Sequence, residues 1–361
     1  MRIDETICIK IISTFSQNFK TLKKGLLFLI FILQVSFVVR SQEYYLKHFQ
    51  VEDGLSHNSV ICSLQDKDGF LWFGTKDGLN RFDGYNYKLY RNESLNNASI
   101  GSNFIQAIYE HQNFLWVGTD NGLYKFDKDQ DKFTLLSITK NQSIQDIESD
   151  IDGNIWFIAG GTLYKYEVDT NKYVVFDPAD FFDALSITKS PDNTLWIASF
   201  NQIYKYDANN VNFTSVGVKP IDSTEFPYII STIESLSSKE ILIGTQNHGA
   251  IQFNIQNGTQ QNIIENENEP IYVRDFAKKG ADELWIGTEN GLYIYNLQTQ
   301  KSTHLQKNYK DHYALSDNAI YTVTVDNEQG VWLGTYFGGI NYYPKQYTPF
   351  KKYFPKFNEN S

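Results

Sequence analysis

The sequence is poor in cysteine, methionine and proline: its 361 residues include 2 Cys, 1 Met and 8 Pro. Cys8 falls in a leader segment described below, which leaves Cys62 without a partner, so disulfide bonds are not expected to hold the fold. Cys62 lies in a stretch of alternating apolar residues and is predicted to be a buried structural thiol. Aromatic residues are abundant instead, and their 16% share indicates a large packed core.

Catalytic and metal-binding patterns are missing as well. No HExxH, CxxC, His-x-His, GxSxG or GxxxxGK[ST] segment occurs, and the six histidines are scattered along the chain. We therefore expect no catalytic residue, no metal site and no cofactor. Acidic residues sit mostly in turns, where we interpret them as solvated turn formers: Asp66, Asp68, Asp150, Asp152, Asp192 and Asp326.

The first 41 residues are typical of a signal peptide. Lys20, Lys23 and Lys24 precede an apolar run at 25–39, and Ser41 offers a small residue for cleavage before Gln42. The run has about 15 residues, whereas a spanning helix needs about 20. The alternative is an uncleaved signal anchor. No later segment reaches spanning length, so we expect a periplasmic protein.

The net charge excludes two classes of partner. The chain carries −10, and removing 1–41 takes away six basic and two acidic residues, which leaves −14. Nucleic acid and anionic membrane surfaces both attract proteins of the opposite sign. Neither is therefore an expected partner.

One phrase recurs seven times. Its copies begin 44, 40, 40, 46, 43 and 47 residues apart, the length of one four-stranded propeller blade. They read LWFGTKDGLNRFD (71–83), LWVGTDNGLYKFD (115–127), IWFIAGGTLYKYE (155–167), LWIASFNQIYKYD (195–207), ILIGTQNHGAIQFN (241–254), LWIGTENGLYIYN (284–296) and VWLGTYFGGINYY (331–343). Their centres are Trp72, Trp116, Trp156, Trp196, Leu242, Trp285 and Trp332.

Each copy divides into strands. In the first, a short apolar strand, a tight turn at Gly78 and an alternating strand follow one another, with another strand on either side. The sequence thus predicts an all-β, seven-bladed β-propeller over 42–355, with four antiparallel strands per blade and a tail at 356–361. The central tryptophan, present in six of the seven copies, is expected to fill the space between neighbouring blades. A helical solenoid would need 3.6-residue periodicity, which is absent after residue 41.

A closed ring needs a seam between the chain ends. Residues 44–49 precede the first blade and have no other evident place, so we expect them to form the outer strand of the last blade. The alternative is that residues 350–354 fill that slot.

Ligand binding is expected on the face that carries the long, variable connections between blades, such as 92–103, 216–228 and 304–318. Three of these connections end alike, placing Asn58, Asn103 and Asn318 at equivalent positions. They are candidate ligand-binding residues that would offer amide groups to a hydroxyl-rich ligand. The alternative is that each asparagine caps its own turn.

The turns between the second and third strands supply the other candidates. They are Phe200 and Asn201 in blade four, Asn247 and His248 in blade five, and Tyr336 and Phe337 in blade seven. Aromatic rings beside amides suit a sugar face or a protein partner, although they also suit packing against a neighbouring loop. Alanine at both Tyr336 and Phe337 is expected to abolish binding without unfolding the chain.

The phrase [LI]W[ILFV]GTxxGLxxxD and the opening EDGLSHNSV…QDxxGFLWFGTKDGLNRFDG (52–84) closely resemble the two-component regulator propeller repeat. The resemblance covers residues 44 to about 355. It implies an extracytoplasmic sensor of a Bacteroidetes hybrid two-component system (a hybrid sensor histidine kinase), which detects glycan fragments. The sequence ends after one propeller and contains no kinase motif, so we expect an N-terminal piece of a split or truncated receptor.

Three functions follow from these patterns. The first is a ligand-sensing propeller, whose partner is a glycan or the remaining sensor and kinase polypeptide. The second is a propeller-fold polysaccharide lyase or hydrolase, because a carboxylate pair or a His and Glu on one loop face leaves no sequence pattern. The third is a periplasmic scaffold that docks another exported protein.

Overall fold

The computed structural model describes residues 44–178, 182–218, 228–265 and 269–345. The predicted signal peptide at 1–41, the tail at 356–361 and the alternative seam strand at 350–354 lie outside the described residues. Within the described ranges, no helix has both the length and the apolar character to cross a membrane.

The described residues form seven four-stranded antiparallel sheets, and each sheet is one blade. Blade one is β2 (Val60–Gln65), β3 (Leu71–Thr75), β4 (Gly78–Phe82) and β5 (Tyr87–Tyr90); blade two is β6 (Ile105–His111), β7 (Phe114–Thr119), β8 (Gly122–Asp127) and β9 (Lys132–Leu135). Blade three is β10 (Ile144–Ser149), β11 (Ile155–Ala159), β12 (Thr162–Glu167) and β13 (Lys172–Phe176); blade four is β14 (Ala184–Lys189), β15 (Leu195–Ser199), β16 (Gln202–Asp207) and β17 (Asn212–Gly217). Blade five is β18 (Ile230–Ser237), β19 (Glu240–Thr245), β20 (Ala250–Asn254) and β21 (Gln260–Ile264); blade six is β22 (Val273–Lys279), β23 (Glu283–Thr288), β24 (Gly291–Asn296) and β25 (Lys301–Leu305). Blade seven is β26 (Ile320–Val325), β27 (Val331–Thr335), β28 (Ile340–Tyr343) and β1 (Lys47–Phe49), and two short 3-10 helices, η2 (Val51–Asp53) and η3 (Ser137–Thr139), lie in the connections.

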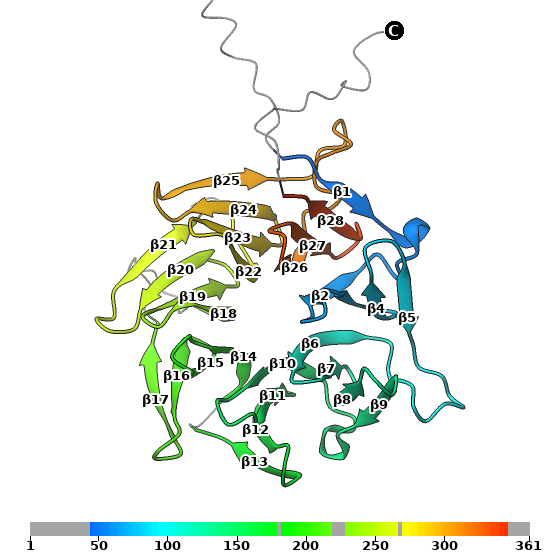
Figure 1. Cartoon of the computed structure of the whole chain (residues 1–361). Helices are drawn as coiled ribbons and strands as arrows, with labels where there is room; N and C mark the ends of the chain where they lie inside the picture. Colours follow the sequence, from blue (N-terminus) through cyan, green and yellow to red (C-terminus); the bar gives the residue numbers. More distant parts are fainter. Residues whose placement is uncertain (1–43, 179–181, 219–227, 266–268, 346–361) are drawn as a thin grey trace, which may run out of the picture. The chain divides into compact units, whose positions relative to one another are not determined.

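The first strand of each blade is the inner one, and these inner strands contact each other in a closed cycle. The order is β2, β6, β10, β14, β18, β22, β26 and back to β2. Figure 1 shows the blades arranged around this inner ring. The predicted seven-bladed propeller with four strands per blade is confirmed.

The seam prediction is confirmed too. Strand β1 pairs antiparallel with β28, so that Lys47 faces Tyr342 and Phe49 faces Ile340. Residues from the start of the described chain therefore supply the outer strand of blade seven (Figure 1).

The tryptophans lie between neighbouring blades, as predicted. Trp72 of blade one packs in one cluster with Ile105, Leu115 and Phe126 of blade two. Trp332 of blade seven packs against Phe73 of blade one. Large apolar side chains at this repeated position thus supply much of the contact between blades.

Four of the tryptophans donate their indole N–H to a side chain six residues earlier in the chain. The acceptors are Asp66 for Trp72, Asp150 for Trp156, Ser190 for Trp196 and Asp326 for Trp332. Asp66 and Asp326 are also buried, and each accepts backbone N–H groups of its own turn. The interpretation of these two aspartates as solvated turn formers was wrong, because both carboxylates are buried and each binds an indole N–H besides its own turn.

Blade five, which lacks the tryptophan, also lacks the acceptor. Leu242 stands at the tryptophan position, and Leu236 lies six residues before it. The two leucines belong to the same apolar cluster. Blade five thus has an apolar pair where four other blades have an indole and its acceptor.

The inner strands are also joined by side chains that reach the next blade. Every inner strand has a bulge after its first residue, and in blades three and six the residue after the bulge is an aspartate that bonds to the next inner strand. Asp146 accepts the backbone N–H of Ile187, at 2.9 Å, and Asp275 accepts that of Val323, at 2.7 Å. Each carboxylate thus fixes one blade against the next.

The charge state of these two aspartates leads to a pH prediction. Desolvation raises the pKa of Asp146 and of Asp275 to about 6. A carboxyl group with a raised pKa favours folding in its protonated form, so its contribution is complete below the unfolded pKa near 4 and is lost as the pH rises through about 6. Asparagine does not ionise, so the Asp146→Asn, Asp275→Asn double variant should not lose this contribution. We therefore expect the difference in melting temperature, variant minus wild type, to increase by several degrees from pH 4 to pH 7.

Thermal melts followed by circular dichroism across that range would measure this difference. Asp152→Asn is the matched control, because Asp152 is an exposed aspartate in a turn. Parallel melting curves of wild type and double variant at all pH values would contradict the prediction.

Candidate functional site

The loop face is the face on which the connections between blades meet the turns between second and third strands. In blade one the N–H of Lys76 in that turn bonds to the carbonyl of Ser59, the residue before the inner strand. Asp120 and Phe104 make the same contact in blade two, and further equivalents occur in blades three, five, six and seven. The two kinds of connection therefore share one face, as the sequence predicted.

The three aligned asparagines close their own connections. The side-chain oxygens of Asn58, Asn103 and Asn318 accept the backbone N–H of Val51, Asn92 and Lys307, at 3.1, 2.7 and 2.7 Å. Each N–H lies two residues past an outer strand, so each asparagine ties the start of a connection to its end. These hydrogen bonds agree with the alternative that each asparagine caps its own connection. A role of the three asparagines in ligand binding stays a prediction.

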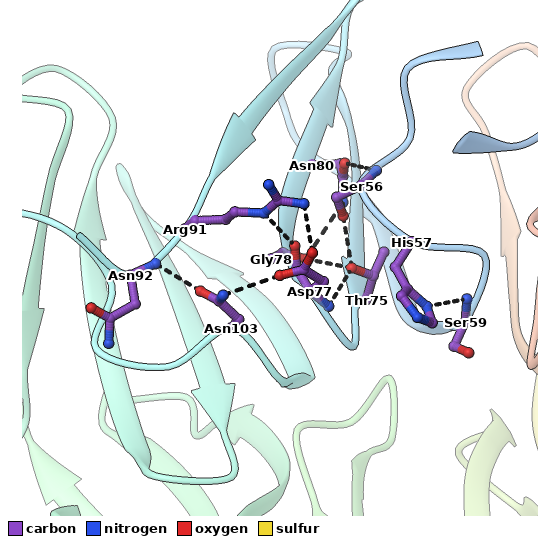
Figure 2. A network of polar contacts seen from close by, with 10 residues as sticks. All are labelled: Ser56, His57, Ser59, Thr75, Asp77, Gly78, Asn80, Arg91, Asn92 and Asn103. Atoms are coloured by element: carbon purple, nitrogen blue, oxygen red, sulfur yellow. Dashed lines mark hydrogen bonds and ion pairs between the residues drawn. The ribbon is translucent and has the colours of Figure 1, made fainter. Parts of the chain in front are cut away.

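Figure 2 shows the surroundings of Asn103 in detail. Its side-chain NH₂ donates to Asp77 at 3.1 Å, and Asp77 also forms an ion pair with Arg91 at 2.6 Å. The charge of Asp77 is thereby matched within the loop. This network fixes the turn of blade one that carries Lys76.

The candidates of blades four and five make separate sets of contacts. Phe200 is 47% exposed, and Asn201 and Asn247 accept the backbone N–H groups of Val218 and Ile271 through their own carbonyls. The ring of His248 packs edge-on against Tyr228, at 4.7 Å between centroids. Among the described residues, no hydrogen bond, ion pair or ring contact joins these four candidates to Tyr336 or Phe337.

Tyr336 and Phe337 belong to a larger cluster. We call it the cation–aromatic ladder, a chain of six side chains from blades two, one, seven and six. They follow one another in the order Phe104, Lys76, Tyr336, Tyr321, Arg274 and Tyr272. Phe337 flanks Tyr336 edge-on and is 72% exposed.

The spacings in the ladder are those of ring–cation and ring–ring contacts. The ammonium of Lys76 lies 3.9 Å from the centre of the Tyr336 ring and donates to its hydroxyl. The rings of Tyr336 and Tyr321 stack at 4.9 Å. The guanidinium of Arg274 lies between Tyr321 and Tyr272, at 4.3 and 4.0 Å. Such pairs hold side chains in place, and because they cover the faces of Tyr336 and Tyr321, the ladder presents ring edges and donors to a ligand.

The two cations of the ladder differ in their charge balance. Arg274 forms an ion pair with Glu289, whereas no ion pair joins Lys76 to a carboxylate among the described residues. Desolvation raises the pKa of Tyr321 to about 12, so its hydroxyl stays protonated at neutral pH. The ladder and its flanking Phe337 thus offer hydroxyl groups, ring edges, one exposed ring and one unbalanced positive charge.

Sequence reasoning missed Lys76, Phe104, Tyr272, Arg274 and Tyr321. An alignment of the seven repeats would have placed four of them at equivalent positions. Phe104 and Tyr272 directly precede an inner strand, and Arg274 and Tyr321 lie at the bulge of one. Aligning only three connections, up to the first strand residue, did not reach the bulge.

A second cluster of charges lies where blades one and two meet. The oxygens of Asp66, Asp68 and Glu110 are close enough to hold a metal ion, but the ammonium of Lys128 contacts all three, at 3.3, 2.8 and 2.6 Å. The lysine supplies the positive charge there, so the cluster is a structural ion-pair network.

A pocket of about 660 Å³ lies between blades three and four, away from the ladder. Its lining mixes lysines, carboxylates and aliphatic side chains, including Lys165, Lys205, Asp152, Ile151 and Val211. It contains none of the candidate residues.

Comparison with known proteins supplies the family. The two component regulator propeller model matches residues 54–77 and 99–121, which are the openings of blades one and two. The chain carries the two-component regulator propeller repeat. These regulator repeats hold Asn58, Lys76 and Asn103 of the loop face.

Similar proteins are regulators of the same type. Over 68 residues, the regulator propeller is 47% identical to a protein named Histidine kinase P4 from Formosa agariphila, which corresponds to 19% of the chain and 5% of that protein. The extracellular domain of the putative hybrid two component system BT3049 from B. thetaiotaomicron has the same fold, with a TM-score of 0.70 and 25% identity. That match covers 83% of this chain and 42% of the other, so the regulator propeller spans less than half of either protein.

An enzyme shares the architecture. Virginiamycin B lyase from Staphylococcus aureus superposes with a TM-score of 0.65 at 12% identity, over 84% of this chain and 100% of the lyase. At that identity the likeness concerns the fold alone. The regulator propeller is therefore placed with sensor domains by its repeats, and a propeller by itself does not decide between sensing and catalysis.

Proposed function

We propose that this chain is the ligand-sensing propeller of a periplasmic hybrid two-component sensor and that its ligand is a glycan fragment bound at the cation–aromatic ladder. The regulator repeats support the sensing role. The ladder supports the ligand class, because the exposed ring of Phe337 and the edges of the tyrosine rings, beside hydrogen-bond donors, match the apolar faces and hydroxyl groups of sugars.

The equivalent bulge positions in other blades also support this interpretation. The bulge residues of blades two, three and five are Gln106, Gln145 and Ser231. Ser143, before the inner strand of blade three, donates to Gln106 at 2.6 Å. In these blades, amide and hydroxyl side chains therefore occupy the position that Arg274 and Tyr321 occupy in the ladder. Such groups suit a ligand that is rich in hydroxyl groups.

Removing both central rings tests the proposal. We expect the Tyr321→Ala, Tyr336→Ala double variant to lose at least about thirtyfold in affinity for any oligosaccharide that the wild type binds, as buried aromatic contact residues do. Isothermal titration calorimetry of the full chain against a panel of neutral and acidic oligosaccharides would measure this loss.

Tyr173→Ala is the matched control, because Tyr173 is a half-exposed tyrosine on the outer strand β13, far from the ladder in the repeat. Unchanged affinity in the double variant would overturn the placement of the site. Release of shortened products from the panel would instead favour a lyase or hydrolase, and capture of an exported protein with no glycan binding would favour a scaffold.

A further inference from the structure

The charge balance of the ladder carries a more specific inference about the ligand. Lys76 is half-buried, and its ammonium lies against the Tyr336 ring and 6.0 Å from the centre of the Phe104 ring. An ammonium held among rings has fewer water partners than one in solution, which strengthens its attraction to an anion.

The carboxylates of the same turn and of the neighbouring loops have other partners. Asp77, the next residue in the same turn, binds Arg91 and Asn103. Asp120 accepts from the hydroxyl of Ser102, and Glu289 is paired with Arg274. The positive charge of Lys76 is therefore the one in the ladder that lacks a carboxylate partner among the described residues.

The structure also fixes this lysine firmly. Its backbone N–H bonds to the carbonyl of Ser59, and its side chain donates to the hydroxyl of Tyr336 from blade seven. The turn that carries it is tied down by Thr75, which accepts the N–H of Asp77, as Figure 2 shows. A cation whose position is set before binding loses little freedom when an anion arrives.

We infer that the ligand at the ladder is an acidic saccharide whose anionic group, a carboxylate or a sulfate, binds at Lys76. This inference rests on the proposed function. The sugar ring packs on the exposed ring of Phe337 and along the edges of the tyrosine rings, and the anion forms a charge-assisted hydrogen bond with the ammonium. Arg274 keeps its ion pair with Glu289 and positions the rings of Tyr321 and Tyr272.

The test compares matched acidic and neutral ligands with the full chain. Oligogalacturonides are titrated beside their methyl esters, and sulfated carrageenan oligosaccharides beside their desulfated forms. We expect one acidic member to bind on the order of tenfold to a hundredfold more tightly than its neutral counterpart. We also expect its affinity to fall with rising salt. The pair that shows the difference identifies the anion as carboxylate or sulfate.

The variant Lys76→Met is expected to abolish that difference, so that it binds the acidic and the neutral member with equal affinity. Lys140→Met is the control, because Lys140 is an exposed lysine beside η3, in the connection between blades two and three. Melting temperatures of both variants establish that they fold.

The outcomes separate the inference from the proposed function. Equal affinity for acidic and neutral members overturns the acidic ligand and leaves a neutral glycan sensor. Failure of every saccharide to bind overturns both. Equal binding of hexaglutamate overturns the saccharide class, and a difference that survives Lys76→Met overturns the assignment to this lysine.

Discussion

Deleting residues 44–49 is expected to lower the melting temperature by at least about 10 °C. This segment supplies β1, the outer strand of blade seven. It buries Leu46, which is 2% exposed, and it stacks the ring of Phe49 on Trp332. Truncating a buried leucine or phenylalanine alone costs about 2–5 kcal/mol, and each kcal/mol corresponds to about 2–4 °C in a domain of roughly this size.

Single substitutions resolve the contribution of each side chain to the seam. Leu46→Ala and Phe49→Ala are each expected to account for part of the loss, whereas Lys47→Ala should melt within about 1 °C of the wild type because Lys47 is exposed. Melts followed by tryptophan fluorescence report on all six tryptophans, Trp332 among them. A deletion variant that melts like the wild type would show that the ring closes without β1.

Replacing Asp66 with alanine is expected to cost about 3–5 kcal/mol, the second-largest effect that we predict. The carboxylate is buried, accepts the indole N–H of Trp72 at 2.8 Å and contacts the ammonium of Lys128. Its loss leaves a buried indole donor without an acceptor and takes one carboxylate from the Lys128 network.

The equivalent aspartate of blade seven separates the loss of the indole acceptor from the loss of the ion pair with Lys128. Asp326 accepts the indole N–H of Trp332 but has no ion pair among the described residues. We therefore expect Asp326→Ala to cost less than Asp66→Ala, and Asp152→Ala, in the equivalent turn of blade three, to cost less than about 0.5 kcal/mol. Chemical denaturation would measure all three. Equal losses at Asp66 and Asp152 would contradict the role given to the buried acceptor.

The blades and the seam could be predicted from the sequence because each depends on a local pattern. Each copy of the phrase around Trp72 contains the residues that form two strands and the turn between them. The last blade lacked one strand, and the segment at 44–49 was the one strand without a place. Registers inside a blade follow from alternation along short strands. The interpretation therefore needed no knowledge of how distant blades meet.

The ladder could not be predicted in the same way. Lys76, Tyr336 and Tyr321 come from two blades at opposite ends of the chain, and they meet only because the ring closes there. Likewise, the burial of Asp66 depends on an indole group six residues away and a lysine in the next blade. Side chains of this kind take their roles from neighbours that periodicity does not reveal.

The position of β1 also has a consequence for how the molecule is made. Because His48 of this strand contacts the carbonyl of Ala314, 266 residues later, the earliest part of the propeller to be synthesised finds its partner only when nearly all of it exists. Until then, blade seven would present a bare edge and the strand would have nothing to pair with, and such late, distant pairing slows folding and favours aggregation. Folding helpers in the compartment of synthesis or export would therefore act on this one strand more than on any completed blade.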